Sequence, residues 1–319
     1  MIAVLCGGVG AARFLTALRR VVEPSDTVGI VNTGDDTVLH GLCISPDLDT
    51  VTYTLAEAID RDRGWGLSDE SWRAMEALNR YVAVRPDGSS AAPNWFNLGD
   101  RDLATHFYRT ARLAEGATLT QVTAEICAAW GVAQRLVPMS DDKVSTVVTL
   151  ASGDDVSFQE YFVQLRHGVP VAGVRFEGAD TARLAAGLDE ALTTAECVLL
   201  APSNPIVSIG PIRALHGVDT RLIARRSSVV AISPIVGGAA LKGPADRMMH
   251  ELGHEPSVVG VARLYAPIAG ALVIDPVDAH LADAVEAQGI RAVVTPSVMS
   301  TPEIGAELAR VALRAASGE

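Results

Sequence analysis

The chain has 319 residues, of which 49% are hydrophobic, and its 38 Asp and Glu residues outnumber 26 Lys and Arg, for a net charge of −12. Such an acidic chain is poorly suited to bind nucleic-acid backbones, and no apolar run reaches the roughly 20 residues that a membrane-spanning helix needs. The four cysteines form no closely spaced pair. We therefore expect a soluble, cytoplasmic protein with reduced thiols and with neither nucleic-acid nor membrane partners.

The N-terminal third begins with the apolar run IAVLC, which is followed by the glycine loop GGVG and by residues with helical spacing. A second apolar run, TVGIV, ends at Asn32. Continuous apolar runs are typical of parallel strands covered on both faces. A glycine loop between a strand and a helix aims backbone N–H groups at an anion. It is neither a P-loop nor a complete dinucleotide fingerprint, because no Gly-Lys-Ser/Thr follows and Arg13 stands at the third glycine position.

The middle third has a different pattern. GDRDLATHFYRTARLAEG and TLTQVTAEICAAWG predict amphipathic helices, and residues 144–165 predict two strands around the turn SGDD. Residues 84–94 are rich in turn-forming types. We expect residues 66–170 to be an insertion, helical and hairpin in structure, that covers one edge of the main sheet.

The last third repeats a strand–loop–helix order four times, with the apolar runs CVLLAP, SVVAISP, GALVIDP and RAVVTP. Thr301 and Pro302 are typical of a helix start. The pattern predicts one α/β domain over residues 1–319, with a doubly wound, mostly parallel, Rossmann-like sheet. Right-handed crossovers place the loops after the strands at the carboxyl edge, where ligands bind in such folds.

The segment HELGH at residues 250–254 matches the zinc-protease pattern HExxH. That pattern needs both histidines on one helical face. Gly253 and Pro256 predict that the helix ends before His254, so we do not expect zinc there.

Four acids, Asp35, Asp36, Asp47 and Asp49, lie close together in the sequence, with only His40 near them as a possible positive partner. Asp49 alone could serve as an N-cap for the helical TVTYTLAEAI. A cap needs one acid, however, and a divalent cation such as Mg²⁺ would neutralise the cluster and bridge to ligand phosphates. The acids and the glycine loop together indicate phosphoryl-type transfer.

Two further segments carry polar or aromatic groups that suit a ligand. The loop SNPIVSIGPI offers Ser203, Asn204 and Ser208 on a backbone stiffened by prolines, as a base or phosphate site requires. The lone Lys242 could meet a phosphate, although exposed lysines are usually solvated. The segment NWFN could stack a flat ring, or it could pack as an ordinary loop.

Eight segments, in this order, resemble the transferases of coenzyme F-420 biosynthesis, which comprise archaeal 2-phospho-L-lactate transferases and actinobacterial phosphoenolpyruvyl transferases. They are GGVGAARF, NTGDD, SPDLDTVTYTL, DRDRGWG, LGDRDLATH, LPMSDDKVST, APSNPIVSIGPI and SPIVGGAALKGPA. The resemblance implies a Mg²⁺-dependent homodimer that takes a three-carbon acid linked to guanosine diphosphate as donor. The implied acceptor is 7,8-didemethyl-8-hydroxy-5-deazariboflavin, whose ribityl hydroxyl attacks the β-phosphorus, releasing GMP and forming dehydro coenzyme F-420-0 or its saturated form.

The resemblance also implies roles for residues of this chain. It places Mg²⁺ at Asp47 with Asp35 or Asp49, and Asp49 alternatively at the acceptor hydroxyl as a base. The other implied ligand contacts are Gly8, Gly10 and Arg13 to the donor phosphates, Ser203, Asn204 and Ser208 to guanosine, Asn97 and Trp95 (with Phe96) to the acceptor, and Asn32 at the end of the second strand. Some segments resemble the actinobacterial branch and others the archaeal one, so the donor acid stays open, with phosphoenolpyruvyl favoured.

Two other functions fit the sequence less well. A related fold serves in regulators that bind nucleotide sugars without catalysis, but such a module needs neither an acid cluster nor a flat acceptor pocket. An NAD(P)-dependent oxidoreductase is disfavoured, because the fingerprint lacks its last glycine and Asn32 stands where an acid would bind ribose.

Overall fold

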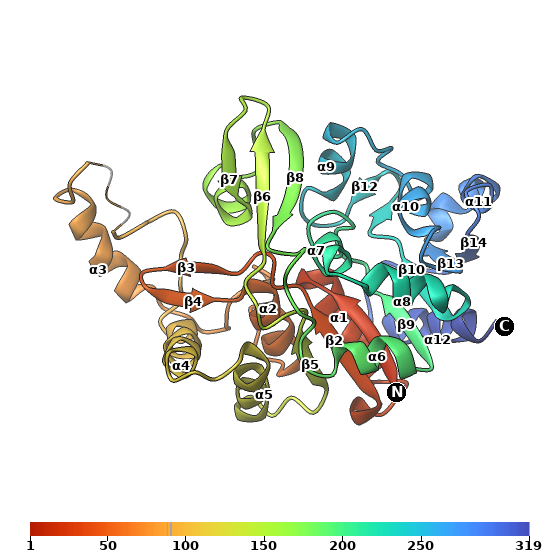
Figure 1. Ribbon diagram of the computed structural model, residues 1–319, viewed down its shortest axis with the longest axis horizontal. Coiled ribbons are helices and arrows are strands. Elements are labelled where there is room, and N and C mark those ends of the chain that lie inside the picture. The colour runs from red at the N-terminus through yellow and green to blue at the C-terminus, as the bar shows by residue number, and fades with distance from the viewer. Residues whose placement is uncertain (88, 90, 319) are drawn as a thin grey trace.

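The structure is a computed structural model that describes residues 1–87, 89 and 91–318. Its central sheet contains β1 (Ile2–Cys6), β2 (Thr27–Val31), β5 (Arg135–Pro138), β9 (Cys197–Leu200), β10 (Val229–Ile232), β13 (Ala271–Ile274) and β14 (Arg291–Val294). The strand order is β14-β13-β10-β9-β1-β2-β5, and every neighbouring pair is parallel (Figure 1). The predicted doubly wound α/β fold is confirmed.

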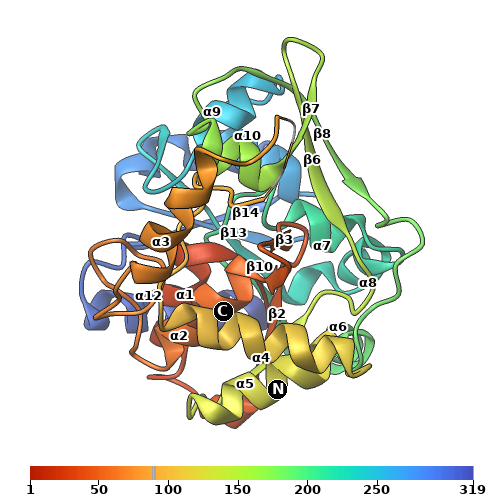
Figure 2. The same ribbon diagram turned by 90° about the vertical axis from the view of Figure 1, so that its left-hand side faces the viewer.

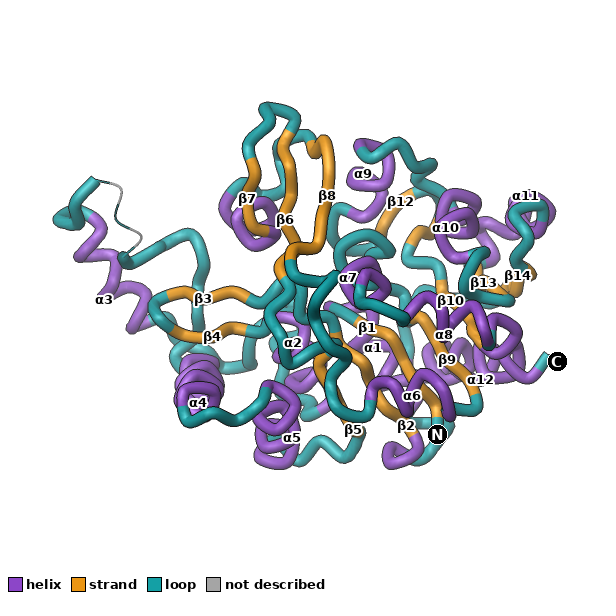
Figure 3. Tube along the Cα trace, viewed as in Figure 1, coloured by secondary structure: helices purple, strands orange, loops and turns teal. Residues whose placement is uncertain are grey.

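Two layers of helices bury the two faces of this sheet. One layer contains α6 (Leu188–Thr194), α7 (Gly210–Ala214), α8 (Val218–Ala224), α10 (Val258–Tyr265) and α11 (Ala282–Glu286). The other contains α1 (Gly8–Leu18), α2 (Pro46–Leu55), α5 (Leu119–Ala129) and α12 (Pro302–Ser317) (Figure 3). Along β1, Ala3 and Leu5 face the first layer, whereas Val4 and Cys6 face the second. Because both faces are covered, the strand is apolar at every position rather than at alternate ones.

Helix ends follow the local sequence signals. The Thr301 hydroxyl accepts a hydrogen bond from the Ile304 N–H, and Pro302 occupies the first turn of α12, as predicted. Helix α9 (Ala245–Glu251) ends before His254, so HELGH does not place its two histidines on one helix. The predicted end of this helix before His254 is confirmed.

A small antiparallel sheet rises above the carboxyl edge of the central sheet (Figure 1). Its order is β7-β6-β8, formed by Asp155–Ser157, Ser145–Leu150 and Val171–Glu177. The predicted second strand within residues 144–165 is wrong beyond Ser157, because Glu160–Gln164 form a π-helix. Phe158 and Tyr161 of this turn bury their rings in a cluster with Val148, which an extended strand would not allow.

The middle third also supplies α3 (Arg73–Val82) and α4 (Asp102–Ala114), while the hairpin β3 (Thr37–Leu39)–β4 (Leu42–Ile44) precedes it. Figure 2 shows α4 and α5 lying side by side. The range 66–170 expected as an insertion contains β5, which belongs to the central sheet, and the small sheet continues past it to Glu177. This stretch therefore contributes a strand to the central sheet and is not a separate insertion.

The remaining elements are short. They are the hairpin β11 (Ile235–Val236)–β12 (Ala239–Ala240) and 3-10 turns at Pro24–Asp26, Arg226–Ser228 and Pro276–Leu281. Across residues 1–87, 89 and 91–318, no helix combines the length and the apolar character needed to cross a bilayer.

Candidate active site

A cavity of about 740 Å³ opens at the carboxyl edge of the sheet. Loops that follow β1, β2, β9, β10 and β14 all contribute to its wall, together with the π-helical turn and residues 63–66. The volume lies within the range of small-molecule sites. Its position agrees with the general location of ligands in open α/β sheets.

Most of the residues singled out in the sequence line this cavity: Gly8, Gly10, Arg13, Asp35, Asp47, Asp49, Asn97, Ser203, Asn204 and Ser208. Asn32 and Trp95 do not line it. Asn32 is fully buried and donates from Nδ2 to Asp47 Oδ2 at 2.9 Å, so it acts on the carboxylate and not on the cavity. Trp95 packs edge-on against Phe96, and Phe96 is the ring that reaches the wall.

The glycine loop is tightly enclosed. A Cβ atom on Gly10 would lie 2.2 Å from the backbone oxygen of Pro202, and one on Gly7 would lie 2.6 Å from Asp47 Oδ2. The backbone N–H of Gly8 hydrogen-bonds the Asp47 carboxylate. The loop therefore meets a carboxylate directly, and a phosphate at the same place needs a cation between the two anions.

The four N-terminal acids separate into two pairs, and in the first pair, Asp36 and Asp49, it is Asp49 that has a cation. Arg109 of α4 contacts both carboxylate oxygens of Asp49, with Nη1 3.1 Å from Oδ2. Burial raises the pKa of Asp36, while the Ser45 hydroxyl and the charge of Arg109 partly offset that effect. The expectation that these acids lack a positive partner is wrong for Asp49. Asp36 accepts a hydrogen bond from the Ser45 hydroxyl, and its Oδ1 is buried without a hydrogen-bond partner.

Asp49 is not an N-cap either. Helix α2 begins at Pro46 with Ser45 at the N-cap position, so Asp49 lies within the first turn. Proline favours the first helical position, and this starts the helix earlier than the acid spacing suggests. Asp49 is consequently turned toward α4, where Arg109 meets it.

The second pair, Asp35 and Asp47, has no ion-pair partner in the part of the chain that the structure describes. Burial and the nearby charge of Asp47 raise the pKa of Asp35 well above its usual range. Burial raises the pKa of Asp47 to about 6. Asp35 Oδ1 is buried without a hydrogen-bond partner. Two adjacent carboxylates with an unsatisfied oxygen fit a hard divalent cation such as Mg²⁺.

Helix α4 contributes acidic and basic side chains that the sequence reasoning missed. Asp102 and His106 line the cavity, and Arg109 lies behind them at helical spacing on the same face. His106 Nε2 lies 3.3 Å from Asp102 Oδ2, and the Tyr53 hydroxyl donates to Asp102 at 2.6 Å. The spacing of Asp, His and Arg in DLATHFYR was a usable signal for this buried polar face.

Asp49, Asp102 and His106 also offer ligand atoms close enough together to hold a metal ion. Arg109 already neutralises Asp49 there, and a second cation would be repelled by the guanidinium. Asp35 and Asp47 therefore fit a metal better than this group does.

Two cations line the cavity near the glycine loop. Arg13 is exposed on the first turns of α1, and the Lys242 amine would lie 2.7 Å from a Cβ atom on Gly64. Gly64 has φ +78°, a backbone conformation that favours glycine. Arg63 also lines the cavity, but its guanidinium lies 3.0 Å from Asp60 and over the rings of two tryptophans. Arg13 and Lys242 give this part of the cavity positive charge opposite the carboxylates.

Comparison with known proteins identifies a family whose sequences match this chain. The model of the family described as 2-phospho-L-lactate transferase CofD matches residues 2–303. A phosphoenolpyruvate transferase of Kitasatospora aureofaciens is 42% identical over 317 residues, covering 98% of this chain and 96% of the relative. One from Streptomyces griseus subsp. griseus is 41% identical over 319 residues, covering 99% and 98%.

Among solved structures, a UPF0052-family protein of Bacillus halodurans superposes with a TM-score of 0.61. The match covers 98% of both chains at 13% sequence identity. This likeness supports the fold alone, because chains so different in sequence share architecture without sharing chemistry.

Proposed function

Because the chain belongs to the 2-phospho-L-lactate transferase family CofD, we propose that it transfers a phosphoenolpyruvyl or 2-phospho-L-lactyl group from a guanosine diphosphate-linked donor to a deazaflavin. The acceptor is the ribityl hydroxyl of 7,8-didemethyl-8-hydroxy-5-deazariboflavin. The products are GMP and dehydro coenzyme F-420-0 or its saturated form. The names of the relatives favour the phosphoenolpyruvyl donor.

One observation supports this proposal above the others: a single cavity brings the glycine loop, the loop after β9 and the carboxylates of the N-terminal third together. A nucleotide-linked donor needs contacts for its base, its phosphates and its acid, and the wall offers groups for each. Ser203, Asn204 and Ser208 are assigned to guanosine, and Gly8, Gly10 and Arg13 to the phosphates. Asn97 and Phe96 face the space left for the flat acceptor.

In the proposed reaction the ribityl oxygen attacks the β-phosphorus while the bond from that phosphorus to the bridging oxygen of GMP breaks. The leaving GMP takes the bonding electron pair, and the hydroxyl proton passes to a carboxylate. The chain positions both ligands in line, which is the main requirement of phosphoryl transfer. Mg²⁺, when bound, supplies positive charge to the phosphate oxygens, and Asp35 and Asp47 are the residues proposed to hold it.

Product analysis by mass spectrometry tests the proposal. The protein is incubated with the deazaflavin, Mg²⁺ and each guanosine diphosphate-linked donor in turn. We expect a new phosphodiester and released GMP, both absent with Asp47→Ala or after chelation. No product with either donor, together with retained binding of GDP or a UDP-sugar, would instead indicate a nucleotide-sugar-binding regulator.

A homodimer is also proposed from the family resemblance. Light scattering after size-exclusion chromatography measures the mass directly. A mass equal to one 33.4 kDa chain would contradict it.

A further inference from the structure

Helix α4 has a buried polar face toward α2, and the reaction proposed above assigns no role to its side chains. Asp102, His106 and Arg109 follow one another along this face. His106 is 1% exposed and Arg109 is 2% exposed. Burying a guanidinium is costly unless its charge is neutralised and its N–H groups are bonded. The face must therefore be organised around a specific anion.

That anion is Asp49. The Arg109 guanidinium contacts both of its carboxylate oxygens in a two-pronged arrangement and also approaches the Cys43 backbone oxygen at 3.4 Å. Such paired contacts fix the orientation of a carboxylate as well as its charge. Each carboxylate oxygen keeps a second lone pair, so Asp49 can still accept a hydrogen bond from the cavity that it lines.

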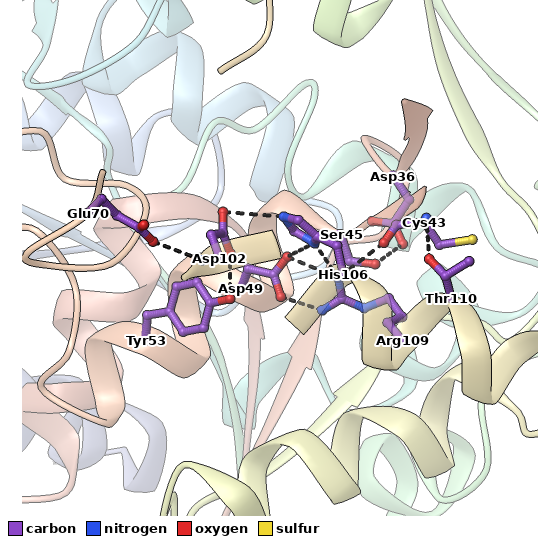
Figure 4. A network of polar contacts seen from close by, with 10 residues as sticks. All are labelled: Asp36, Cys43, Ser45, Asp49, Tyr53, Glu70, Asp102, His106, Arg109 and Thr110. Atoms are coloured by element: carbon purple, nitrogen blue, oxygen red, sulfur yellow. Dashed lines mark hydrogen bonds and ion pairs between the residues drawn. The ribbon is translucent and has the colours of Figure 1, made fainter. Parts of the chain in front are cut away.

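His106 holds Arg109 in turn (Figure 4). Its Nδ1 lies 3.3 Å from Arg109 Nη1. A guanidinium has only donors, so Nδ1 must accept, and the ring proton then resides on Nε2. Nε2 lies 3.3 Å from Asp102 Oδ2, a close polar contact without hydrogen-bond geometry, and the backbone N–H of Asp102 donates to Glu70 at 2.9 Å. The contacts thus run from Glu70 through Asp102 and His106 to the guanidinium.

We propose that Arg109, supported by His106 and Asp102, is a positioning residue that withholds Asp49 from the metal and presents it as a fixed hydrogen-bond acceptor for the attacking hydroxyl. This inference rests on the proposed function. The acids then have different roles. Asp35 and Asp47 bind the divalent cation, while Asp49 accepts a hydrogen bond from the hydroxyl of the acceptor. A guanidinium on both oxygens of Asp49 neutralises it already, whereas no cation of the described residues neutralises the other pair.

The first experiment measures metal binding, which does not depend on turnover. Mg²⁺ is titrated calorimetrically into the wild type, Asp47→Asn and Asp49→Asn. The two variants are matched, because each replaces one carboxylate oxygen by an amide nitrogen. We expect Asp47→Asn to weaken Mg²⁺ binding at least tenfold and Asp49→Asn to change it less than threefold. Equal losses in both variants would overturn the division of the acids.

The second experiment tests positioning with Arg109→Lys, which keeps the charge and loses the two-pronged contact. We expect kcat to fall ten- to a hundredfold, with the donor KM and the Mg²⁺ affinity unchanged, because a small misplacement of a reacting group costs rate more than binding. A lower melting temperature with unchanged kcat per folded molecule would show a merely structural role and overturn the proposal.

If Arg109→Lys does not fold, His106→Leu removes the support behind Arg109 while leaving the ion pair intact. The same loss of kcat at constant donor KM is expected, and an unchanged kcat refutes the proposed support. A wild type that binds Mg²⁺ but makes no product would count against the proposed function. The calorimetric comparison of Asp47→Asn and Asp49→Asn would still be decisive for the division of the acids.

Discussion

Replacing Asp47 by Asn should stabilise the metal-free protein at neutral pH and leave its stability unchanged in acid. Burial raises the pKa of Asp47 from 3.8 to about 6 in the folded chain. The native state therefore binds this proton more tightly than the unfolded state does. The free energy of unfolding of the wild type then falls as the pH rises from about 4 to about 6. Above pH 6 Asp47 is ionised in both states, and the wild type stays less stable by the full amount.

The size of the effect follows from the shift. A displacement of about two pKa units corresponds to about 3 kcal/mol, since one unit is worth about 1.4 kcal/mol. Asp47 is only half-buried by its exposed area, so solvent screening lowers our expectation to about 1–2 kcal/mol. Asp35 acts in the same direction, because the charge of Asp47 raises its pKa as well and the amide removes that charge.

Urea unfolding in a chelator at pH 5 and pH 8 measures the difference between Asp47→Asn and the wild type. Because pH 5 lies in the middle of this window, we expect the variant's advantage there to be about half of its advantage at pH 8. Mg²⁺ at a hundred times the wild-type dissociation constant should then stabilise the wild type by about 2.7 kcal/mol and the variant by at most about 1.4 kcal/mol. A variant that is no more stable at pH 8 than at pH 5, relative to wild type, would refute the reasoning about this carboxylate.

Three further predictions concern other parts of the molecule. Gly10→Ala places a methyl group 2.2 Å from the Pro202 backbone oxygen and should destabilise the fold by about 2–4 kcal/mol, measured by thermal unfolding; a change below about 0.5 kcal/mol would contradict this contact. Lys242→Met should raise the donor dissociation constant about tenfold without changing Mg²⁺ affinity, since a hydrogen bond to a charged group is worth about 1.5–3 kcal/mol; unchanged calorimetric donor binding would show a solvated lysine. Thr301→Ala removes the acceptor for the Ile304 N–H and should cost about 1 kcal/mol in urea unfolding, whereas Thr301→Ser should cost less.

Local patterns were enough to predict the architecture. The continuous apolar runs of β1 and β2 predict covered parallel strands, and Thr301–Pro302 predicts the start of α12, because these signals depend on neighbouring residues alone. The π-helical turn at Glu160–Gln164 was not predictable in this way. Its apolar residues have strand-like composition, and only packing against Val148 decides that they turn instead.

In the candidate site, too, local sequence predicts some features and packing decides others. Gly8 and Asp35 are predictable from the sequence, because each follows a predicted strand and such loops meet at one edge of a parallel sheet. Asp47 is predicted instead by the acid cluster and the family resemblance. Asn32 was chosen for the same reason as Gly8 and Asp35, yet its amide turns away from the cavity to donate to Asp47. Strand-end position selects the residue, and side-chain packing decides which way it points.

The sequence by itself determined that acids, a glycine loop and small polar groups gather at the carboxyl edge, because right-handed crossovers between parallel strands place the following loops there. Only the tertiary structure decided which acids keep an unneutralised charge. Arg109 lies 60 residues from Asp49 along the chain, and the packing of α4 against β4 brings the side chains of α4 to those of α2. Electrostatic neutralisation depends on distance in space, so no spacing within the acid cluster could reveal that Asp49 is paired while Asp35 and Asp47 are left for a cation.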